Sequence, residues 1–225
     1  ILGRSGCGKS VLLKLILRLI VPDEGRIIID GVDTTGFTDF EMNKIRKRIG
    51  ILFQGSALFD SFTVEENVAY PLIEHSKIMA DEIRRRVAEV LSFVELDGTE
   101  KLMPSELSGG MKKRVALARA IITNPDYIFF DEPTTGLDPI TARKIDELIV
   151  RTSKEFGTTI VVVTHDLVSA FAVGSRFAFI HDGKITFSGS RDELLKSDRV
   201  EVQEFLRQSE WKRNSLQEGV VEAGL

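Results

Sequence analysis

The chain has one cysteine, no apolar run of membrane-spanning length and no excess of positive charge. A single cysteine excludes an internal disulfide and fits a reducing compartment. A membrane span needs about 20 apolar residues, and Lys14 and Arg18 interrupt the longest apolar stretch. The formal net charge of −4 indicates no nucleic-acid partner, and the basic run at residues 44–48 fits a solvated helix face. Hydrophobic residues make up 43% of the 225, enough to bury the core of one α/β domain with a helical insert.

A phosphate-binding loop is predicted near the start of the chain. Residues 3–10 read Gly-x-x-x-x-Gly-Lys-Ser and lead into a helix predicted over residues 11–20. Glycines at this spacing let backbone N–H groups turn toward phosphate oxygens, while Lys9 adds a positive charge and Ser10 offers a hydroxyl ligand for Mg²⁺. The positive end of the helix favours the same phosphates. The predicted nucleotide-binding residues are Gly3, Arg4, Ser5, Gly6, Cys7, Gly8, Lys9, Ser10 and Val11.

Cys7 lies inside this loop, and two interpretations of it remain open. A small residue is all that the position requires, so steric tolerance explains its presence. A thiol beside Lys9 and a helix N-terminus also meets the conditions for a reactive cysteine.

Two carboxylates follow a strand that is predicted to be buried on both faces. The strand is Tyr-Ile-Phe-Phe at residues 127–130, as in a parallel sheet, and Asp131 and Glu132 come directly after it. A pair of acids is a poor structural choice at the tip of such a strand. Asp131 suits the Mg²⁺ that bridges nucleotide phosphates, and Glu132 suits a general base for the attacking water.

A second anion site is predicted at Leu-Ser-Gly-Gly-Met, residues 107–111. This segment precedes a helix predicted over residues 112–122, which stops at Asn124-Pro125. Ser108 is therefore predicted to be the N-cap of this helix, with two glycines behind it. Such an end offers bare N–H groups and partial positive charge.

The order of these motifs resembles that of the ATP-binding-cassette (ABC) ATPases. The chain also has Gln54 after an apolar strand, Gly-Leu-Asp-Pro at residues 136–139, and His165 after the apolar residues 160–163. The resemblance covers nearly the whole chain and implies an α/β fold, a P-loop NTPase (RecA-like) core with an inserted helical subdomain. It also implies ATP hydrolysis in a head-to-tail dimer, where each ATP lies between the phosphate loop of one copy and the Ser108 end of the other.

The same resemblance implies a role for each motif residue. Glu132, His165 and Lys9 would be catalytic, with His165 contacting the γ-phosphate. Ser10, Gln54 and Asp131 would hold Mg²⁺, and Asp138 would lie in a dimer loop. The residues that would contact the opposing subunit's ATP are Leu107, Ser108, Gly109, Gly110 and Met111, with Met111 where many ABC proteins have Gln.

Three longer sequence segments resemble those of one branch of that family, the ATPases of Mla/Mce-type lipid transporters. They are Leu-Phe-Gln-Gly-Ser-Ala-Leu-Phe at residues 52–59, Asn-Val-Ala-Tyr-Pro-Leu at 67–72, and the segment at 101–111. This resemblance implies a transmembrane permease and a lipid-binding Mce-type component as partners, and a place on the cytoplasmic face of the inner membrane. ABC ATPases have further N-terminal strands with an aromatic residue that stacks on adenine, so we expect the domain to be N-terminally truncated.

Two other classes of function compete with a transport motor. A non-transport ABC ATPase of the DNA-repair type would have a long coiled coil between Gln54 and Ser108, and this interval is short. A cell-division type regulator of a membrane partner is not distinguished by the motifs and remains the alternative. An inactive regulator is disfavoured because the motif residues are intact: Lys9, Asp131, Glu132 and His165.

The predicted organisation is one nucleotide-binding domain over residues 1–225. Its core is expected at residues 1–60 and 106–195, a helical subdomain at about 61–105, and a C-terminal helical tail at 196–225. His75 and His181 are expected at the surface. Predicted strands lie at 26–30, 49–53 and 158–163, and a hairpin is predicted from 177–180 and 185–187. Predicted helices lie at 141–156 and 198–213, and an apolar helical face runs from Ile83 to Val94. Capping boxes are predicted at Thr63 and Glu66 and, for a short helix, at Ser190 and Glu193.

Overall fold

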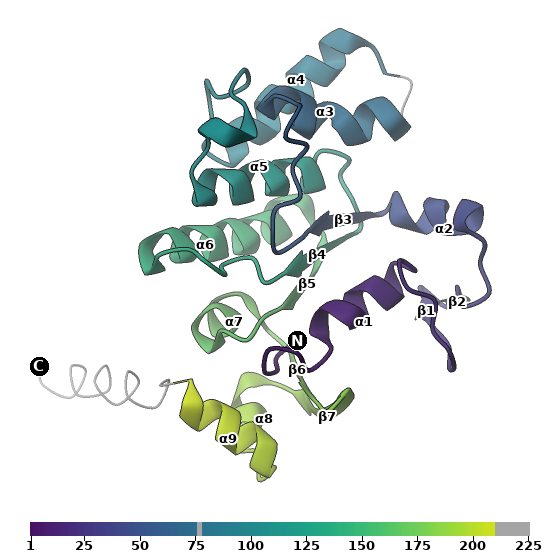
Figure 1. Cartoon of the computed structure of the whole chain (residues 1–225), viewed down its shortest axis with the longest axis vertical. Helices are drawn as coiled ribbons and strands as arrows, with labels where there is room; N and C mark the ends of the chain where they lie inside the picture. Colours follow the sequence, from purple (N-terminus) through teal and green to yellow (C-terminus); the bar gives the residue numbers. More distant parts are fainter. Residues whose placement is uncertain (76–77, 210–225) are drawn as a thin grey trace, which may run out of the picture. The chain divides into compact units, whose positions relative to one another are not determined.

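A computed structural model describes residues 1–75 and 78–209 of the chain (Figure 1). The chain divides into two compact units. Unit 1 consists of Ile1–Lys9 together with the chain from Val162 onward, and unit 2 consists of Ser10–Val161.

The centre of unit 2 is a sheet whose strands follow in the order β3 (Ile49–Leu52), β4 (Tyr127–Asp131) and β5 (Thr159–Val163). β3 and β4 are parallel, with Ile49 opposite Tyr127 and Leu52 opposite Phe130. Because their apolar side chains are covered on both faces, Leu52, Ile128 and Phe130 are fully buried. Gln54 follows β3 and Glu132 follows β4, so the carboxyl ends of two neighbouring strands carry the predicted polar residues.

Three helices of unit 2 pack together beside this sheet: α3 (Val64–His75), α4 (Ala80–Phe93) and α5 (Gly109–Ile121) (Figure 1). The Thr63–Glu66 capping box at the start of α3 is confirmed, and the apolar face of α4 is buried at Val87, Val90 and Leu91. A short 3₁₀ helix, Pro104–Glu106, leads into α5. α5 also contacts β3 and α6 (Pro139–Phe156), so it connects the helices to the sheet.

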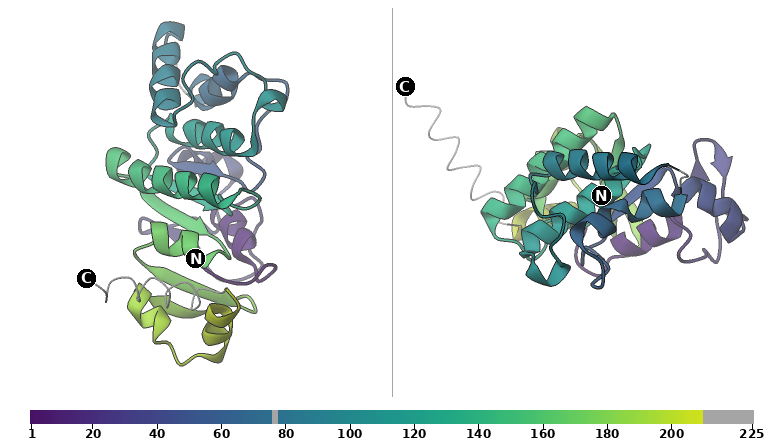
Figure 2. Two further views of the ribbon diagram at one scale, coloured as in Figure 1. Left: turned by 90° about the vertical axis from the view of Figure 1, so that its left-hand side faces the viewer. Right: turned by 90° about the horizontal axis from the view of Figure 1, so that it is seen from above.

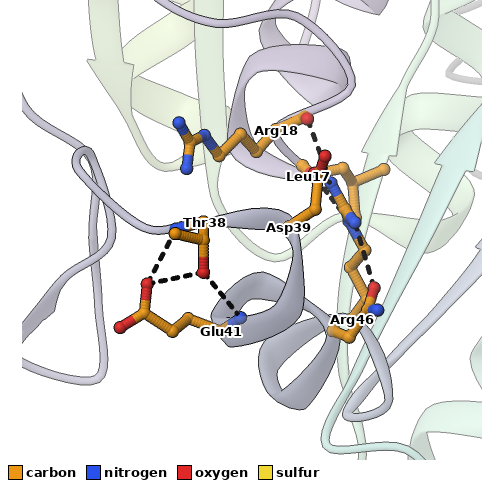
Figure 3. A network of polar contacts seen from close by, with 7 residues as sticks. Leu17, Arg18, Thr38, Asp39, Glu41 and Arg46 are labelled. Atoms are coloured by element: carbon orange, nitrogen blue, oxygen red, sulfur yellow. Dashed lines mark hydrogen bonds and ion pairs between the residues drawn. The ribbon is translucent and has the colours of Figure 1, made fainter.

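The first helix of unit 2 is shorter than predicted. The helix expected over residues 11–20 is α1, Lys9–Ile16, because Arg18 adopts a left-handed backbone with φ of 53°. The guanidinium of Arg46 donates to the carbonyls of Leu17 at 3.0 Å and Arg18 at 3.1 Å just beyond the end of α1 (Figure 3). Arg46 comes from α2 (Asp39–Arg46), whose first turn is fixed by a Thr38–Glu41 capping box. The basic residues 44–48 therefore do more than form a solvated helix face, because Arg46 among them stabilises the end of α1.

The strand expected at residues 26–30 is also shorter. β1 (Ile28–Ile29) pairs with β2 (Val32–Asp33) as a two-stranded antiparallel ribbon, which leaves Ile28 and Val32 exposed. A ribbon of this size is marginal by itself, and the ion pair of Arg48 with Asp30 at 2.7 Å fastens it to β3.

Unit 1 is formed by segments from both ends of the sequence. Leu2 forms parallel bridges with Thr164 and Phe179 and is fully buried. The predicted hairpin is confirmed as β6 (Phe177–His181) and β7 (Lys184–Gly189). α7 (Leu167–Val173), α8 (Arg191–Leu195) and α9 (Val200–Gln208) complete the unit (Figure 2). Its core consists of Leu2, Leu167, Ala170, Phe177, Phe179, Leu194, Val202, Phe205 and Leu206.

The Ser190–Glu193 cap of α8 is confirmed. The last predicted helix, 198–213, is shorter at its start because α9 begins at Val200. The final residues of that predicted helix, 210–213, lie outside the described residues.

Candidate active site

The phosphate loop in unit 1 is held by the side chain of its own lysine. The Lys9 amine, only 5% exposed, donates to the carbonyl of Gly3 at 2.9 Å and to that of Arg4 at 3.1 Å. Gly6 and Gly8 have φ values of 81° and 103°, which side-chain-bearing residues rarely adopt, so the glycines of the motif allow the turn. The structure therefore presents Lys9 inside the predicted loop rather than in solvent.

A hydroxyl and a carboxylate meet in unit 2, at the start of α1 and the end of β4. Ser10 Oγ donates to Asp131 Oδ1 at 2.8 Å, and Asp131 is 7% exposed. Mg²⁺ prefers such hard oxygen ligands and usually takes only one or two carboxylates, with phosphates and water completing its shell. Within the described residues there is no cluster of three or more His, Cys, Asp or Glu side chains that could hold a metal alone. The donor set fits Mg²⁺ brought with a nucleotide.

Glu132 has an unusual backbone for a glutamate. Its φ is 49°, in the left-handed region that favours glycine, and its side chain is 7% exposed. The Thr135 hydroxyl donates to Glu132 Oε2 at 3.2 Å. Such backbone conformations cost about 1–3 kcal/mol and are retained where surrounding structure holds them, often at functional sites. The general base predicted from the sequence is thus buried and conformationally fixed.

Lys113, on α5, was not singled out by the sequence analysis. It is 4% exposed, and its amine donates to the carbonyl of Gln54 and, at 3.5 Å, to that of Glu132. Burial lowers the pKa of Lys113, although the nearby carboxylates of Asp131 and Glu132 partly oppose this. In the sequence Lys113 is the middle residue of a basic triplet at 112–114, and nothing in the neighbouring sequence indicates that its side chain is buried.

The loop after β3 carries Gln54, whose side chain is exposed. Ser56 and Ala57 follow with positive φ values of 63° and 48°. Arg119 of α5 donates to the Ser56 carbonyl at 2.9 Å, and burial lowers the pKa of this arginine. α5 therefore holds the Gln54 loop at two points, through Lys113 and Arg119.

The second predicted anion site has the expected local structure. Ser108 is the N-cap of α5, and its hydroxyl accepts a hydrogen bond from the Met111 N–H at 3.3 Å. Ser108 and Gly109 are exposed, whereas Leu107 and Gly110 are buried. The cap positions the helix end, where Ser108 and Gly109 are exposed to solvent.

Asp138 has a structural role that the sequence analysis did not assign. It is the N-cap of α6, and its carboxylate accepts hydrogen bonds from the N–H groups of Ile140 and Thr141, both at 3.0 Å. Hydrogen bonds from Thr141 and Ile140 hold the pKa of Asp138 below its usual value. In unit 1, His165 is exposed and precedes Asp166, which caps α7.

A sequence profile of the family described as ABC transporter matches residues 1–135 of the chain. The chain belongs to the ABC transporter family. Members of the family bind and hydrolyse ATP, so this ABC protein is an ATPase. The predicted family and fold class are thereby confirmed. No helix in the described ranges, 1–75 and 78–209, is long and apolar enough to cross a membrane.

Individual relatives agree with the family assignment. The ABC protein is 43% identical over 92% of its length to the intermembrane phospholipid transport system ATP-binding protein MlaF of Haemophilus influenzae, of which it covers 78%. It is 42% identical over 92% of its length to the probable ribonucleotide transport ATP-binding protein mkl of Mycobacterium tuberculosis, of which it spans 57%. Among solved structures, the dimeric ATP-binding cassette MJ0796 in a post-hydrolysis state with ADP and phosphate superposes with a TM-score of 0.77. That cassette is 39% identical, and the match covers 84% of this chain and 83% of the cassette.

Proposed function

We propose that this ATPase drives the transport of a phospholipid or another hydrophobic molecule through a membrane permease. The observation that carries the substrate class is the 43% identity to MlaF over 92% of the chain, together with the phrases around Gln54 and Ser108. The mkl relatives carry ribonucleotide in their name, which makes a soluble nucleotide the competing substrate. The contact of Ser10 with Asp131, with Glu132 directly following, supports ATP hydrolysis as the driving reaction.

The proposed chemistry assigns one task to each polar group. The backbone N–H groups of the phosphate loop and the Lys9 amine bind the phosphates of ATP. Ser10, Asp131 and Gln54 would hold Mg²⁺, which neutralises phosphate charge when bound. Glu132 accepts a proton from the attacking water.

His165 would contact the γ-phosphate and orient that water. His165 is exposed and lies directly after Thr164, at the end of β5. A histidine can donate a hydrogen bond to a phosphate oxygen in either of its neutral tautomers.

The proposed active form is a head-to-tail dimer. Ser108 and Gly109 are exposed at the N-terminus of a 13-residue helix, a geometry that favours an anion from another molecule. The other copy's ATP would supply that anion, and Asp138 would lie in the loop between the two copies. The dimeric form of the MJ0796 cassette supports this arrangement.

A surface groove in unit 2 supports docking of the permease. It has a volume of about 320 Å³ and is lined by residues of β3, α3 and α5. Its lining includes the apolar side chains of Phe53, Phe59, Tyr70 and Pro71. This groove begins at the Gln54 loop. A permease segment bound there would respond to the conformation of Gln54, which is proposed to contact Mg-ATP. The ATPase would then lie at the cytoplasmic face of the inner membrane, with an Mce-type lipid-binding component as a further partner.

Two variants of the full-length protein test the ATP reaction and the dimer. Glu132→Gln cannot take a proton, so hydrolysis should fall by about 10²-fold or more while ATP still binds and accumulates in a closed dimer. Adding Ser108→Arg places bulk and charge at the opposing helix end and should prevent closure. Size-exclusion chromatography with light scattering should show an ATP-dependent dimer for the single variant and a monomer for the double variant. Dimers in both without ATP, or monomers in both with ATP bound, would contradict the role of Ser108.

The substrate class is tested in the purified transport complex. We expect the ATPase to co-purify with a polytopic permease and a lipid-binding component. Lys9→Ala should stop transfer of labelled phospholipid between vesicles while the complex still assembles. Recovery with a soluble binding protein for sugars or amino acids, or ATP-dependent uptake of ribonucleotide instead of lipid, would reject the lipid assignment.

A further inference from the structure

Lys113 connects the two strand ends that carry the reaction's polar residues. Its buried amine donates both to the carbonyl of Gln54, after β3, and to that of Glu132, after β4. These strands are parallel neighbours, so their carboxyl ends lie at one edge of the sheet. A buried ammonium is unfavourable unless its donors are satisfied, and a lysine has three donors to place. One side chain thus bridges two peptide groups that are 78 positions apart in the sequence.

Both peptide groups belong to segments that need external support. Glu132 has a φ of 49°, and Ser56 and Ala57, just after Gln54, have φ values of 63° and 48°. Residues with side chains adopt this region only where the surroundings hold them. Arg119 donates to the Ser56 carbonyl at 2.9 Å, in the Gln54 loop. Lys113 therefore differs from Arg119 because it touches both segments.

We propose that Lys113 is a positioning residue for ATP hydrolysis, holding the backbone of Glu132 in register with the Gln54 loop. The inference rests on the proposed function, in which Glu132 activates water and Gln54 contacts Mg²⁺. Lys113 donates to two carbonyls, so it acts on the backbone that carries Gln54 and Glu132 rather than on the reacting atoms. Removing its amine lets the base and the loop move independently, which slows the chemical step more than ATP binding.

The test compares four variants of the full-length ATPase, and a fifth, Glu132→Gln, as a reference, with the wild type. Lys113→Met keeps the length of the side chain and removes its donors, and Lys113→Arg restores a cation. Lys112→Met is the matched control, since its side chain is half-buried on the same helix. Arg119→Met removes the other anchor of the same loop.

The inference predicts a split between kcat and KM. Lys113→Met should lower kcat by at least about tenfold, with a change in KM for ATP of less than about threefold. Lys113→Arg should recover most of the wild-type kcat, and the kcat of Lys112→Met should stay within about twofold of the wild type. The loss of kcat in Arg119→Met should be smaller than that in Lys113→Met. Hydrogen exchange in the ATP-free protein should quicken at both residues 53–59 and residues 132–136 for Lys113→Met, and only at 53–59 for Arg119→Met.

Several outcomes would overturn the inference. One is an equal loss of kcat in the Lys113→Met and Arg119→Met variants. Another is a kcat for Lys113→Arg as low as that of Lys113→Met, and a third is a change in Lys113→Met that affects KM for ATP but not kcat. Glu132→Gln serves as the reference that separates this inference from the proposed function. An inactive Glu132→Gln beside a fully active Lys113→Met rejects the Lys113 role alone, whereas a fully active Glu132→Gln rejects the proposed base and this inference together.

Discussion

Replacing Gly50 with alanine should disrupt the contact between β3 and α5. A Cβ atom added at Gly50 would lie 2.3 Å from the Ala120 carbonyl oxygen and 3.1 Å from its carbonyl carbon. An ordinary contact is about 3.5 Å, so the strand and the helix must separate by about 1 Å. The obstructing atoms are backbone, and α5 is tied to the neighbouring loop through Lys113 and Arg119, so little relaxation is available.

The magnitude follows from overpacking of a well-packed core, which costs about 1–3 kcal/mol. Because backbone must move, we expect the upper end, about 3 kcal/mol, for Gly50→Ala. Unfolding in urea followed by circular dichroism should then show a midpoint lowered by roughly 1 M, for an m-value of about 2–3 kcal/mol/M.

Gly36→Ala is the matched control for this experiment. Gly36 has open space around an added Cβ and no left-handed backbone, so the free energy of unfolding should change by no more than about 0.5 kcal/mol. The ATPase kcat of Gly50→Ala should fall as well, because α5 moves relative to the Gln54 loop. Equal urea midpoints for Gly50→Ala and Gly36→Ala would refute the close approach of β3 and α5.

Two further predictions concern the phosphate loop and the end of α1. Alkylation of Cys7, which is half-buried in the loop, should abolish ATP binding, and saturation with Mg-ATP should protect the thiol; equal labelling rates with and without nucleotide would contradict this. Arg46→Met removes the donors to the Leu17 and Arg18 carbonyls and should lower the free energy of unfolding by about 1–2 kcal/mol. Asn43→Ala removes a partner of the same guanidinium but leaves both carbonyls satisfied, so an equal or larger loss in that variant would count against the proposed role of Arg46.

Features that are encoded within a few residues could be predicted from the sequence. The N-cap at Ser108 and the Thr63–Glu66 capping box depend on side chains three residues from the N–H groups that they satisfy. The contact of Ser10 with Asp131 was implied by two motifs that both place an Mg²⁺ ligand. The Thr38–Glu41 capping box of α2 has an equally local signal, so that helix start was predictable from the sequence and was missed.

Features that depend on distant segments could not be predicted in the same way. Lys113 lies in a basic triplet that reads as solvated, and its burial arises only when α5 packs on a loop 59 residues earlier. The early end of α1 has a similar origin, since the carbonyls of Leu17 and Arg18 are satisfied by Arg46 of another helix. The division into a core, a helical subdomain and a tail remains a prediction.

The pairing of Leu2 with Thr164 and Phe179 has a consequence for how the protein is made. A nascent chain emerges from the ribosome at about 5–20 residues per second, so the partners of Leu2 follow it by roughly 10 to 30 s. During that interval residues 10–161 can begin to fold, while the segment with the phosphate loop still lacks its partners Thr164 and Phe179. The segment that carries the nucleotide-binding loop therefore meets these two partners late in synthesis, so ATP binding stabilises the finished fold more than its early steps.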